Sequence, residues 1–299
     1  MNLANSAQCP VCSAVNVTKV FPLDNDCDML RCNRCGSGFL YPPPTAAYTS
    51  DYYQPYVTSE DSLPRFIARH VHDGRSTSSG YRYVSQLREI EGIMSKFTVR
   101  NSRRLLDVGC GMGGFLIVAR ELGFEVHGTE ISEHARKFCH DHLGLDVVAP
   151  ESLEQISGQF DVITIWHVLE HVMDPKNFIS MYLAKLRSGG LVVIEVPNWS
   201  SFMSRVRKSN WRFIRKDHLI YFTPDSLVYL LNMLRVEVVK GRTTGSLGLT
   251  QHLEHLWKYA GEFIKHHPSA LPIKKTYLHL MSASKLGDFY RIFALKKEE

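Results

Sequence analysis

The sequence has no uninterrupted apolar stretch long enough to span a bilayer, and it has no internal repeat or low-complexity tract. Its first residues, MNLANSAQCP, lack the basic and apolar regions of a secretory signal peptide. The missing apolar stretch and signal peptide argue against a membrane-spanning or exported protein. We therefore expect a soluble, cytoplasmic chain.

The composition sets the scale of what is present. The chain has 299 residues, enough for one α/β domain with appendages, and its hydrophobic content of 44% supports a sizeable core. The formal net charge of +5 is modest. It is compatible with an anionic small-molecule partner and does not require nucleic acid.

The most informative segment is a glycine-rich loop that follows an apolar strand. Residues 105–115 read LLDVGCGMGGF, and Gly109, Gly111 and Gly113 allow a sharp turn with room for a ligand against the backbone. A second strand, FEVHGTE, ends in Glu130, which is placed to accept hydrogen bonds from ribose hydroxyls. The pair predicts the start of a nucleoside-binding α/β domain.

The glycines also fit the GxGxxG dinucleotide pattern, and Asp107 decides against that interpretation. This carboxylate ends the strand directly before the loop, where it would repel a pyrophosphate. S-adenosylmethionine (SAM) carries an ammonium and a sulfonium instead, which an acid attracts. The pattern favours SAM as the cofactor.

Four segments, in the expected order, resemble the class I SAM-dependent methyltransferases over about residues 100–240. LDVGCGMGGF resembles their motif I, with Glu130 as the ribose-binding acid, and the others are FDVITIWHVLEHVMDP (160–175), LRSGGLVVIEVPN (186–198) and DHLIYFTPDSL (217–227). The last is typical of a subgroup that acts on small molecules and sugars. The resemblance implies a Rossmann-like, seven-stranded, mostly parallel sheet whose seventh strand is antiparallel.

Periodicity predicts the same α/β class, with helices on both faces of the sheet. We expect strands near 104–109, 124–129, 146–149, 160–166, 191–196, 236–239 and 290–295. We expect helices near 84–97, 113–122, 132–143, 152–157, 174–187 and 224–233. Asp174-Pro175 and Thr223-Pro224 each provide a capping side chain followed by proline at the first helical position.

Open parallel sheets bind ligands at the carboxyl ends of their strands. The predicted cofactor-binding residues, several of them implied by the resemblance, are Asp107, Gly109, Gly111, Gly113, Glu130, Ile131, Ser152, Leu153 and His167. Ser152 and Leu153 would frame the adenine, and His167 would face the methyl group.

Methyl transfer to a hydroxyl or carbon acid also requires removal of a proton, for which histidine is well suited. In the sugar carbon-methyltransferases that this chain resembles, a histidine after strand four and an acid–histidine pair after strand five line the substrate pocket. His171, Asp217 and His218 occupy those places, with Asp where Glu is expected. Loop bracing or helix capping by His171, and a structural hydrogen bond from His218, are the alternatives.

Four of the seven cysteines form two CxxC knuckles, Cys9-x-x-Cys12 and Cys32-x-x-Cys35. This spacing predicts a structural zinc site of the ribbon type, with redox pairs or reduced buried thiols as alternatives. A similar N-terminal ribbon occurs in many of these small-molecule methyltransferases. It acts either as a folding staple for a segment too short to build its own core or as a recognition module.

The expected organisation is a zinc ribbon (1–41), a linker that wraps the main domain (42–80) and a methyltransferase domain (81–299) with a helical insertion (250–285). Tyr52, Tyr53 and Tyr56 of the linker either line the substrate pocket or anchor the linker. The insertion is compatible with a lid, a homodimer contact, a membrane-surface helix or simple packing on its own domain.

Residues 199–216 join strand five to the predicted catalytic pair and are rich in cations and aromatics. The cations are Arg205, Arg207, Lys208, Arg212, Arg215 and Lys216, and the aromatics are Trp199, Phe202, Trp211 and Phe213. A nucleotide-linked sugar suits both sets, and so does an RNA backbone. A solvated basic lid is the simpler interpretation.

Three functions remain open. The first is methyl transfer from SAM to an oxygen or carbon of a small molecule, such as a sugar, a nucleotide-linked sugar or a biosynthetic intermediate. The second is RNA base methylation with the zinc module as a recognition element, although the sequence has neither an NPPY-type loop after strand four nor a large basic tail. The third is a non-catalytic zinc-ribbon binding protein on a methyltransferase fold.

Overall fold

A computed structural model describes residues 7–24, 26–44, 78–97, 103–244 and 286–297. Most of the predicted linker, including Tyr52, Tyr53 and Tyr56, and the whole predicted insertion (250–285) lie outside the described residues. Among the described helices, none is both long enough and apolar enough to cross a membrane.

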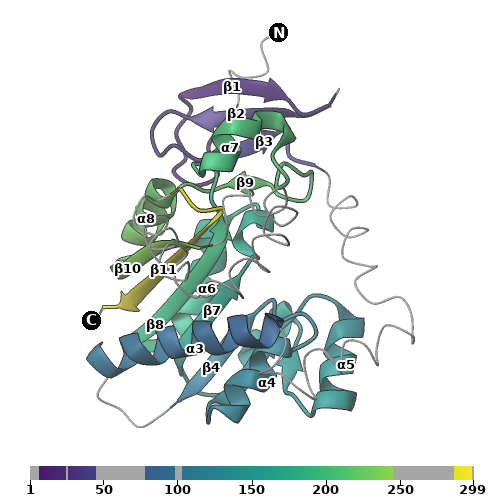
Figure 1. The fold of residues 1–299 in the computed structure, drawn as a ribbon, viewed down its shortest axis with the longest axis vertical. Helices are drawn as coiled ribbons and strands as arrows, with labels where there is room; N and C mark the ends of the chain where they lie inside the picture. The colour runs from purple at the N-terminus through teal and green to yellow at the C-terminus, as the bar shows by residue number, and fades with distance from the viewer. Residues whose placement is uncertain (1–6, 25, 45–77, 98–102, 245–285, 298–299) are drawn as a thin grey trace, which may run out of the picture.

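A seven-stranded sheet forms the body of the molecule, in the order β10-β11-β8-β7-β4-β5-β6 (Figure 1). Its strands are β4 (Arg104–Val108), β5 (Glu125–Thr129), β6 (Val147–Val148), β7 (Phe160–Trp166), β8 (Leu186–Pro197), β10 (Val236–Thr244) and β11 (Phe289–Lys296). The five strands β4 to β8 are parallel to one another. Strand β11 runs antiparallel to both of its neighbours, β8 and β10. The predicted fold, including the antiparallel strand, is confirmed.

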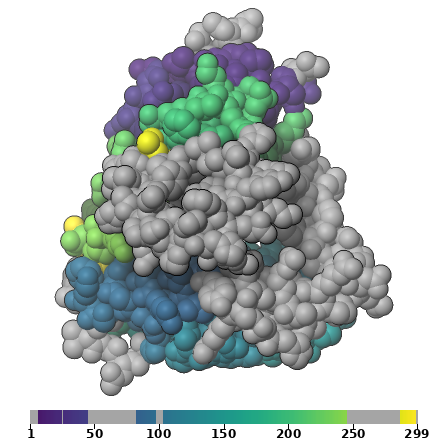
Figure 2. Space-filling model, viewed as in Figure 1, coloured from purple at the N-terminus to yellow at the C-terminus, as the bar shows by residue number. Residues whose placement is uncertain are grey.

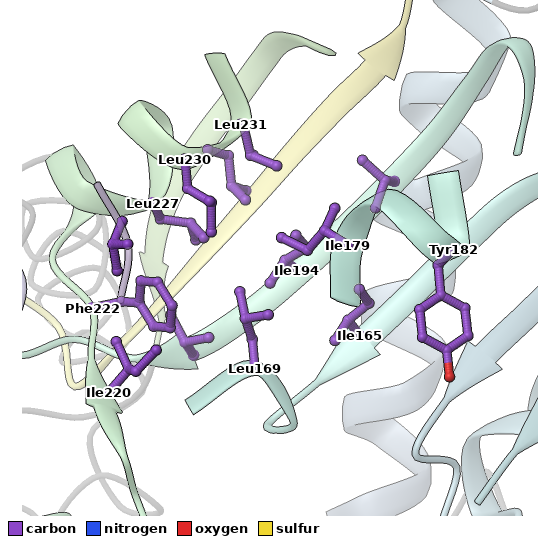
Figure 3. Packing of buried hydrophobic residues seen from close by; sticks show 14 of the residues in the cluster. Ile165, Leu169, Ile179, Tyr182, Ile194, Ile220, Phe222, Leu227, Leu230 and Leu231 are labelled. Carbon is purple, nitrogen blue, oxygen red and sulfur yellow. The ribbon is translucent and has the colours of Figure 1, made fainter. Parts of the chain in front are cut away.

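Helices cover both faces of this sheet because adjacent strand residues point to opposite sides. Leu105 belongs to a core shared with α3 (Ser78–Phe97), α4 (Gly114–Glu121) and α5 (Glu133–Leu143). Its neighbour Leu106 belongs to the opposite core, with α6 (Pro175–Lys185) and α8 (Pro224–Met233). Figure 3 shows this second core, where leucines of α8 meet the strands.

The helix starts follow the predicted signals. Asp174 caps α6 by accepting a hydrogen bond from the Asn177 amide at 3.0 Å. Thr223 and Ser226 form a reciprocal capping box at the start of α8. The short helix expected near 152–157 is instead a 3-10 helix, η3 (Pro150–Gln155).

Two predicted boundaries differ at the junction of α6 and β8. The helix ends at Lys185 and the strand begins at Leu186, five residues before the expected start. The pairing with β7 shifts register between Phe160 and Val162, which accommodates the Gly-Gly turn within β8.

The N-terminal strands make a second, antiparallel sheet. It contains β1 (Val17–Pro22), β2 (Asp28–Cys32) and β3 (Gly38–Tyr41), and its fourth strand is β9 (Ile220–Tyr221) from the methyltransferase region. Phe39 pairs with Ile220 in that sheet. Sequence reasoning did not find this strand, which joins the ribbon to the segment directly after His218.

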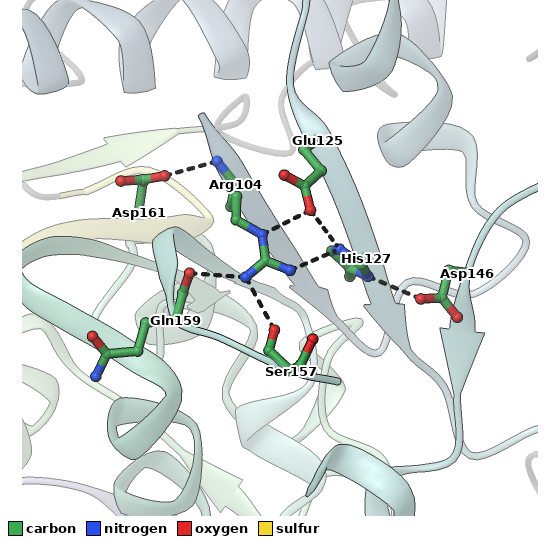
Figure 4. Close-up of polar contacts among 7 residues, drawn as sticks. All are labelled: Arg104, Glu125, His127, Asp146, Ser157, Gln159 and Asp161. Carbon is green, nitrogen blue, oxygen red and sulfur yellow. Dashed lines mark hydrogen bonds and ion pairs between the residues drawn. The ribbon is translucent and has the colours of Figure 1, made fainter. Parts of the chain in front are cut away.

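Arg104 connects the amino ends of neighbouring strands (Figure 4). Its Nε donates to Glu125 at 2.7 Å, and its Nη1 donates to the carbonyls of Ser157 and Gln159 at 3.1 and 3.2 Å. Its backbone amide donates to Asp161 at 2.8 Å. This network stabilises the amino edge of the sheet. The predicted cofactor residues lie at the opposite, carboxyl edge.

Candidate active site

The glycine loop turns directly after β4 and is held against the end of β5. The amides of Gly109 and Cys110 both donate to the Thr129 carbonyl, at 2.7 and 3.0 Å. Gly109 has a φ of +68°, and a Cβ there would lie 2.5 Å from the Val168 side chain. Gly111 has a φ of +56° but faces open space. The loop therefore needs glycine for its backbone at both positions, and at Gly111 it leaves room for a ligand.

Asp107 lies at the end of β4 and is buried, with 2% of its surface exposed. Its Oδ1 accepts a hydrogen bond from the Thr164 hydroxyl at 2.7 Å. Burial raises the pKa of Asp107 to about 7 against the opposing Thr164 hydrogen bond, and the nearby charge of Glu130 adds to the rise. Among the described residues, no cationic side chain pairs with Asp107. Such a buried carboxylate suits a cationic ligand.

Glu130 follows β5 and organises the loop that faces it. Its Oε2 accepts from the Gly111 amide and its Oε1 accepts from the Ser132 amide, each at 2.9 Å. Each carboxylate oxygen keeps a second lone pair, which a ribose hydroxyl can use. The side chain of Ile131, next along the chain, is 63% exposed and offers an apolar surface beside this acid.

The other predicted cofactor residues differ in what they present. Gly113 has a φ of +74° and would place a Cβ 2.6 Å from Leu145, so it packs against the protein. Ser152 is half-buried, whereas the Leu153 side chain is buried in the core and leaves only its backbone for a ligand.

His167, directly after β7, has a left-handed φ of 57°. This conformation is uncommon for a residue with a Cβ and persists only where the surroundings hold it. Its Nε2 lies 3.3 Å from Glu195 of β8, and Arg291 of β11 donates to the same carboxylate at 2.8 Å. Burial alone would raise the pKa of Glu195, but His167 and Arg291 outweigh it and lower that pKa to about 2. Glu195 lies within the LRSGGLVVIEVPN segment (186–198), and no pattern in the sequence indicated a role for it.

The structure brings His171, Asp217 and His218 together. Nδ1 of His171 lies 2.7 Å from the Asp217 carbonyl, which can only accept, so this nitrogen donates and in the neutral ring the lone pair is on Nε2. The rings of His171 and His218 are 4.8 Å apart at 82°. The Leu219 amide donates to the Glu170 carbonyl at 2.8 Å, which joins the two segments.

Burial and the neighbouring His171 imidazole lower the pKa of His218 to about 3. The imidazole is therefore neutral at physiological pH. Glu170, which sequence reasoning did not select, lies beside both histidines and is 2% exposed. Its signal in the sequence was its position between the two histidines of HVLEH.

Acids pair with three of the six cations of residues 199–216. Arg212 binds Asp288 at 3.1 Å, Arg215 binds Asp217 at 2.9 Å, and Lys216 pairs with Asp24 of the ribbon. The other three, Arg205, Arg207 and Lys208, are exposed on α7 (Phe202–Arg207) and η5 (Lys208–Asn210). Figure 2 shows this green segment directly beneath the purple N-terminal strands.

The four knuckle cysteines converge as the spacing predicts. Sγ of Cys9 lies 3.7 Å from that of Cys35, and Sγ of Cys12 lies 3.5 Å from that of Cys32. A tetrahedral zinc site with Zn–S bonds of about 2.3 Å requires sulfurs about 3.8 Å apart. The donor set therefore fits Zn²⁺, with each close pair taking one cysteine from each knuckle.

Comparison with known proteins supports the assignment of the central region. A family model described as "Methyltransferase domain" matches residues 82–234. The chain is 36% identical over 103 residues to a ubiquinone biosynthesis O-methyltransferase of Caulobacter sp. (strain K31), covering 32% of this chain and 41% of that protein. It is 32% identical over 103 residues to the mitochondrial enzyme of that name from Schizosaccharomyces pombe, covering 31% and 38%. The chain thus spans about two fifths of the length of these relatives.

Solved structures share the fold. A SAM-dependent methyltransferase from Archaeoglobus fulgidus superposes with a TM-score of 0.51 at 24% identity, covering 78% of this chain and 99% of that one. The plantazolicin methyltransferase BamL, solved with S-adenosylhomocysteine, superposes with a TM-score of 0.53 at 16% identity, covering 84% and 96%. At these identities the likeness establishes the fold alone.

Proposed function

The chain belongs to the methyltransferase domain family, and from that premise we propose that it transfers a methyl group from SAM to an oxygen of a small-molecule acceptor. One observation carries the proposal. The glycine loop, Asp107 and Glu130 lie at the same carboxyl edge of the sheet as the segment that holds His171 against His218. The names of the curated relatives support oxygen as the methylated atom.

The residues at this edge fit SAM by their chemistry. Asp107 offers a buried negative charge to the cationic methionine part, and Glu130 offers lone pairs to the ribose. Ile131 offers an apolar surface next to that acid. The cofactor, when bound, supplies an electrophilic methyl group, so the protein needs mainly to align the acceptor and remove its proton.

His171 and His218, together with Asp217, are the group that we assign to acceptor activation. The Asp217 carbonyl holds the His171 ring in one orientation and fixes its lone pair on Nε2. Asp217 is itself oriented by Arg215 at 2.9 Å. The ring of Phe213 stacks with that of His218, with centroids 6.3 Å apart and planes at 14°.

We propose a sugar or another polar biosynthetic intermediate as the acceptor class. Two described cations of the cation-rich segment, Arg212 and Arg215, already pair with Asp288 and Asp217. Two carboxylates, those of Glu170 and Asp217, are buried beside the histidines. This arrangement favours an acceptor whose hydroxyls donate hydrogen bonds, and it disfavours an RNA backbone at this position.

We also propose that Cys9, Cys12, Cys32 and Cys35 hold a structural Zn²⁺. The sulfur separations support this assignment, and all four side chains are buried. Four thiolates complete a tetrahedral shell, so such an ion has no open position for a substrate.

Methyl transfer is tested with SAM labelled in its methyl group and a panel of sugars, nucleotide-linked sugars and polar aromatic acceptors. His218→Ala should slow transfer by about 10²–10⁴-fold, the range for loss of an acid–base group, and should leave the affinity for S-adenosylhomocysteine unchanged. His140→Ala is the matched control, because that histidine side chain is 83% exposed on α5. Equal transfer rates in the wild type and His218→Ala would remove His218 from the mechanism.

A further inference from the structure

Several buried polar atoms at and beside the predicted catalytic pair have no hydrogen-bond partner among the described residues. Glu170 and His218 are 2% and 6% exposed. Among the described residues, Oε2 of Glu170, Nδ1 of His218 and Oδ2 of Asp217 have no hydrogen-bond partner. Burying such atoms without a partner is costly, and several of them in one place indicate a ligand or an ion that binds there.

The chemistry of these atoms defines what that ligand must be. Carboxylate oxygens accept hydrogen bonds and donate none, and a neutral imidazole offers one lone pair. Among the described residues, the basic group recorded as an ion-pair partner of Glu170 is His167, whose Nδ1 lies 3.8 Å away and whose Nε2 faces Glu195. These atoms thus present lone pairs, which suit a cation.

We propose that Glu170, His171 and His218 form a second metal site that binds a divalent first-row transition-metal ion. One potential ligand atom from each of the three residues lies within 4.8 Å of the other two. Ligand atoms held about 2.1 Å from one ion at tetrahedral angles lie about 3.4 Å apart, so the ligand atoms must approach one another by up to about 1.4 Å to complete the site. Two imidazoles and one carboxylate are a donor set that such ions prefer.

The surroundings of His171 match those of a metal ligand. Its Nδ1–H donates to the Asp217 carbonyl at 2.7 Å, which points the lone pair of Nε2 in a fixed direction. Metal-bound histidines usually donate their other ring N–H to a carbonyl or carboxylate in this way. The Glu170 carbonyl in turn accepts from the Leu219 amide, so the two ligand-bearing segments are tied together by backbone.

Three protein ligands leave coordination positions open, unlike the closed four-cysteine site. This part of the inference rests on the proposed function, because it assumes that the acceptor binds beside the histidines. An ion there would bind the acceptor oxygen and lower the pKa of its hydroxyl. His171 and His218 would then act as ligands, and Glu170 would be required even though it takes no part in a direct proton transfer.

Cobalt tests the second site without an acceptor. The metal-free full-length protein is titrated anaerobically with Co²⁺, and bound metal is counted while the absorption spectrum is recorded. We expect two ions per chain, of which only one gives a thiolate-to-cobalt charge-transfer band. Glu170→Gln and His171→Gln should each reduce the count from two to one and keep that band, and His140→Ala should retain two ions.

The outcomes separate this inference from the proposed function. One cobalt per chain in the wild type, or two in Glu170→Gln, would overturn the second site. The thiolate band reports whether each variant has kept a folded ribbon, and S-adenosylhomocysteine affinity reports whether the main domain has folded. A wild-type protein that binds two cobalt ions but no S-adenosylhomocysteine would count against the proposed function. The same result would still support the metal site.

Discussion

Individual carboxylates differ sharply in this site because their surroundings differ. Asp107 is buried with a hydroxyl partner, and its pKa is raised to about 7. Glu195 is also buried, but Arg291 and His167 lower its pKa to about 2. Asp107 therefore ionises readily when a cationic ligand binds beside it, whereas Glu195 stays ionised as part of the structure.

The pKa of Asp107 predicts a pH dependence of cofactor binding. If binding requires the carboxylate, affinity for S-adenosylhomocysteine should fall about tenfold per unit as pH decreases below about 7. The free energy of unfolding depends on pH in the opposite direction. Because the pKa of this acid is raised in the fold, the ligand-free folded protein binds more protons than the unfolded chain. Stability from this group is present at low pH and is lost as pH rises through about 7.

Calorimetric titration across pH 5.5 to 8.5 measures the first effect. Asp107→Asn keeps the shape and removes the charge, so its affinity should be weak and independent of pH. Thr164→Val is a useful second variant, because it removes the hydroxyl that lowers the Asp107 pKa. Thr164→Val should move the inflection of the affinity curve to higher pH. If Asp107→Asn still showed the inflection, another group would be responsible for the titration.

At the residue scale, sequence patterns identified the groups with a strong local signature. Asp107, Glu130 and the glycines stand at fixed offsets around one turn, and the four cysteines stand in two knuckles. Glu195 stands in no such pattern, and Glu170 is marked only by its place between the two histidines of HVLEH. Their importance depends on burial and on partners from distant segments, such as Arg291, which a single sequence does not display.

At the scale of elements, the pairing of β3 with β9 links the ribbon to the predicted catalytic segment. The Leu40 amide donates to the Leu219 carbonyl at 3.1 Å, one residue beyond His218. Met29 and Leu40 of the ribbon share a small core with Trp211 and Tyr221. The ribbon is therefore packed into the wall that holds His218.

Gly38 in β3 lies at a tight point of this junction. A Cβ there would come within 2.7 to 2.9 Å of ring carbons of Trp199, so the indole would have to move. Gly38→Ala should lower the free energy of unfolding by about 1–3 kcal/mol through overpacking. Chemical denaturation measures the change.

Gly92 provides the contrasting glycine, since a Cβ there meets nothing within 4 Å on α3. Gly92→Ala should raise the free energy of unfolding by about 0.5–1 kcal/mol, because alanine favours the helix. If Gly38→Ala proved as stable as Gly92→Ala, the close approach of β3 to Trp199 would not exist in solution.

The strand β9 also marks the limit of prediction for elements. The long strands and capped helices follow from periodicity and from Asp174-Pro175 and Thr223-Pro224. β9 has only two residues, and its partner β3 is about 180 positions earlier in the chain. A pairing this short and this distant leaves no periodic pattern in the sequence.

For the whole molecule, two sheets of different construction support one site. The seven-stranded sheet carries the predicted cofactor residues at its carboxyl edge. The last strand of the four-stranded sheet, β9, directly follows His218 of the proposed acceptor site. The short ribbon cannot build a large core, so its stability depends on the four thiols and on its contacts with the main domain.

Removal of the proposed zinc ion should therefore loosen the ribbon end of the molecule before the seven-stranded sheet. Chelation, or Cys32→Ser, should speed hydrogen exchange at the amides of β9 and leave those of β4 and β7 protected. Cys27→Ser is the matched control, because that buried thiol of the ribbon lies outside the four-cysteine group. Uniform loss of protection across both sheets, or a metal-free protein with unchanged exchange, would contradict this division.

The central claim is that the carboxyl edge around Asp107 and Glu130 holds a SAM-type cofactor. Equilibrium titration of the full-length protein with S-adenosylhomocysteine at pH 8 tests it most directly. We predict one bound molecule per chain, with binding abolished in Asp107→Ala while the zinc content stays the same. Absence of binding to the folded wild-type protein would contradict the claim.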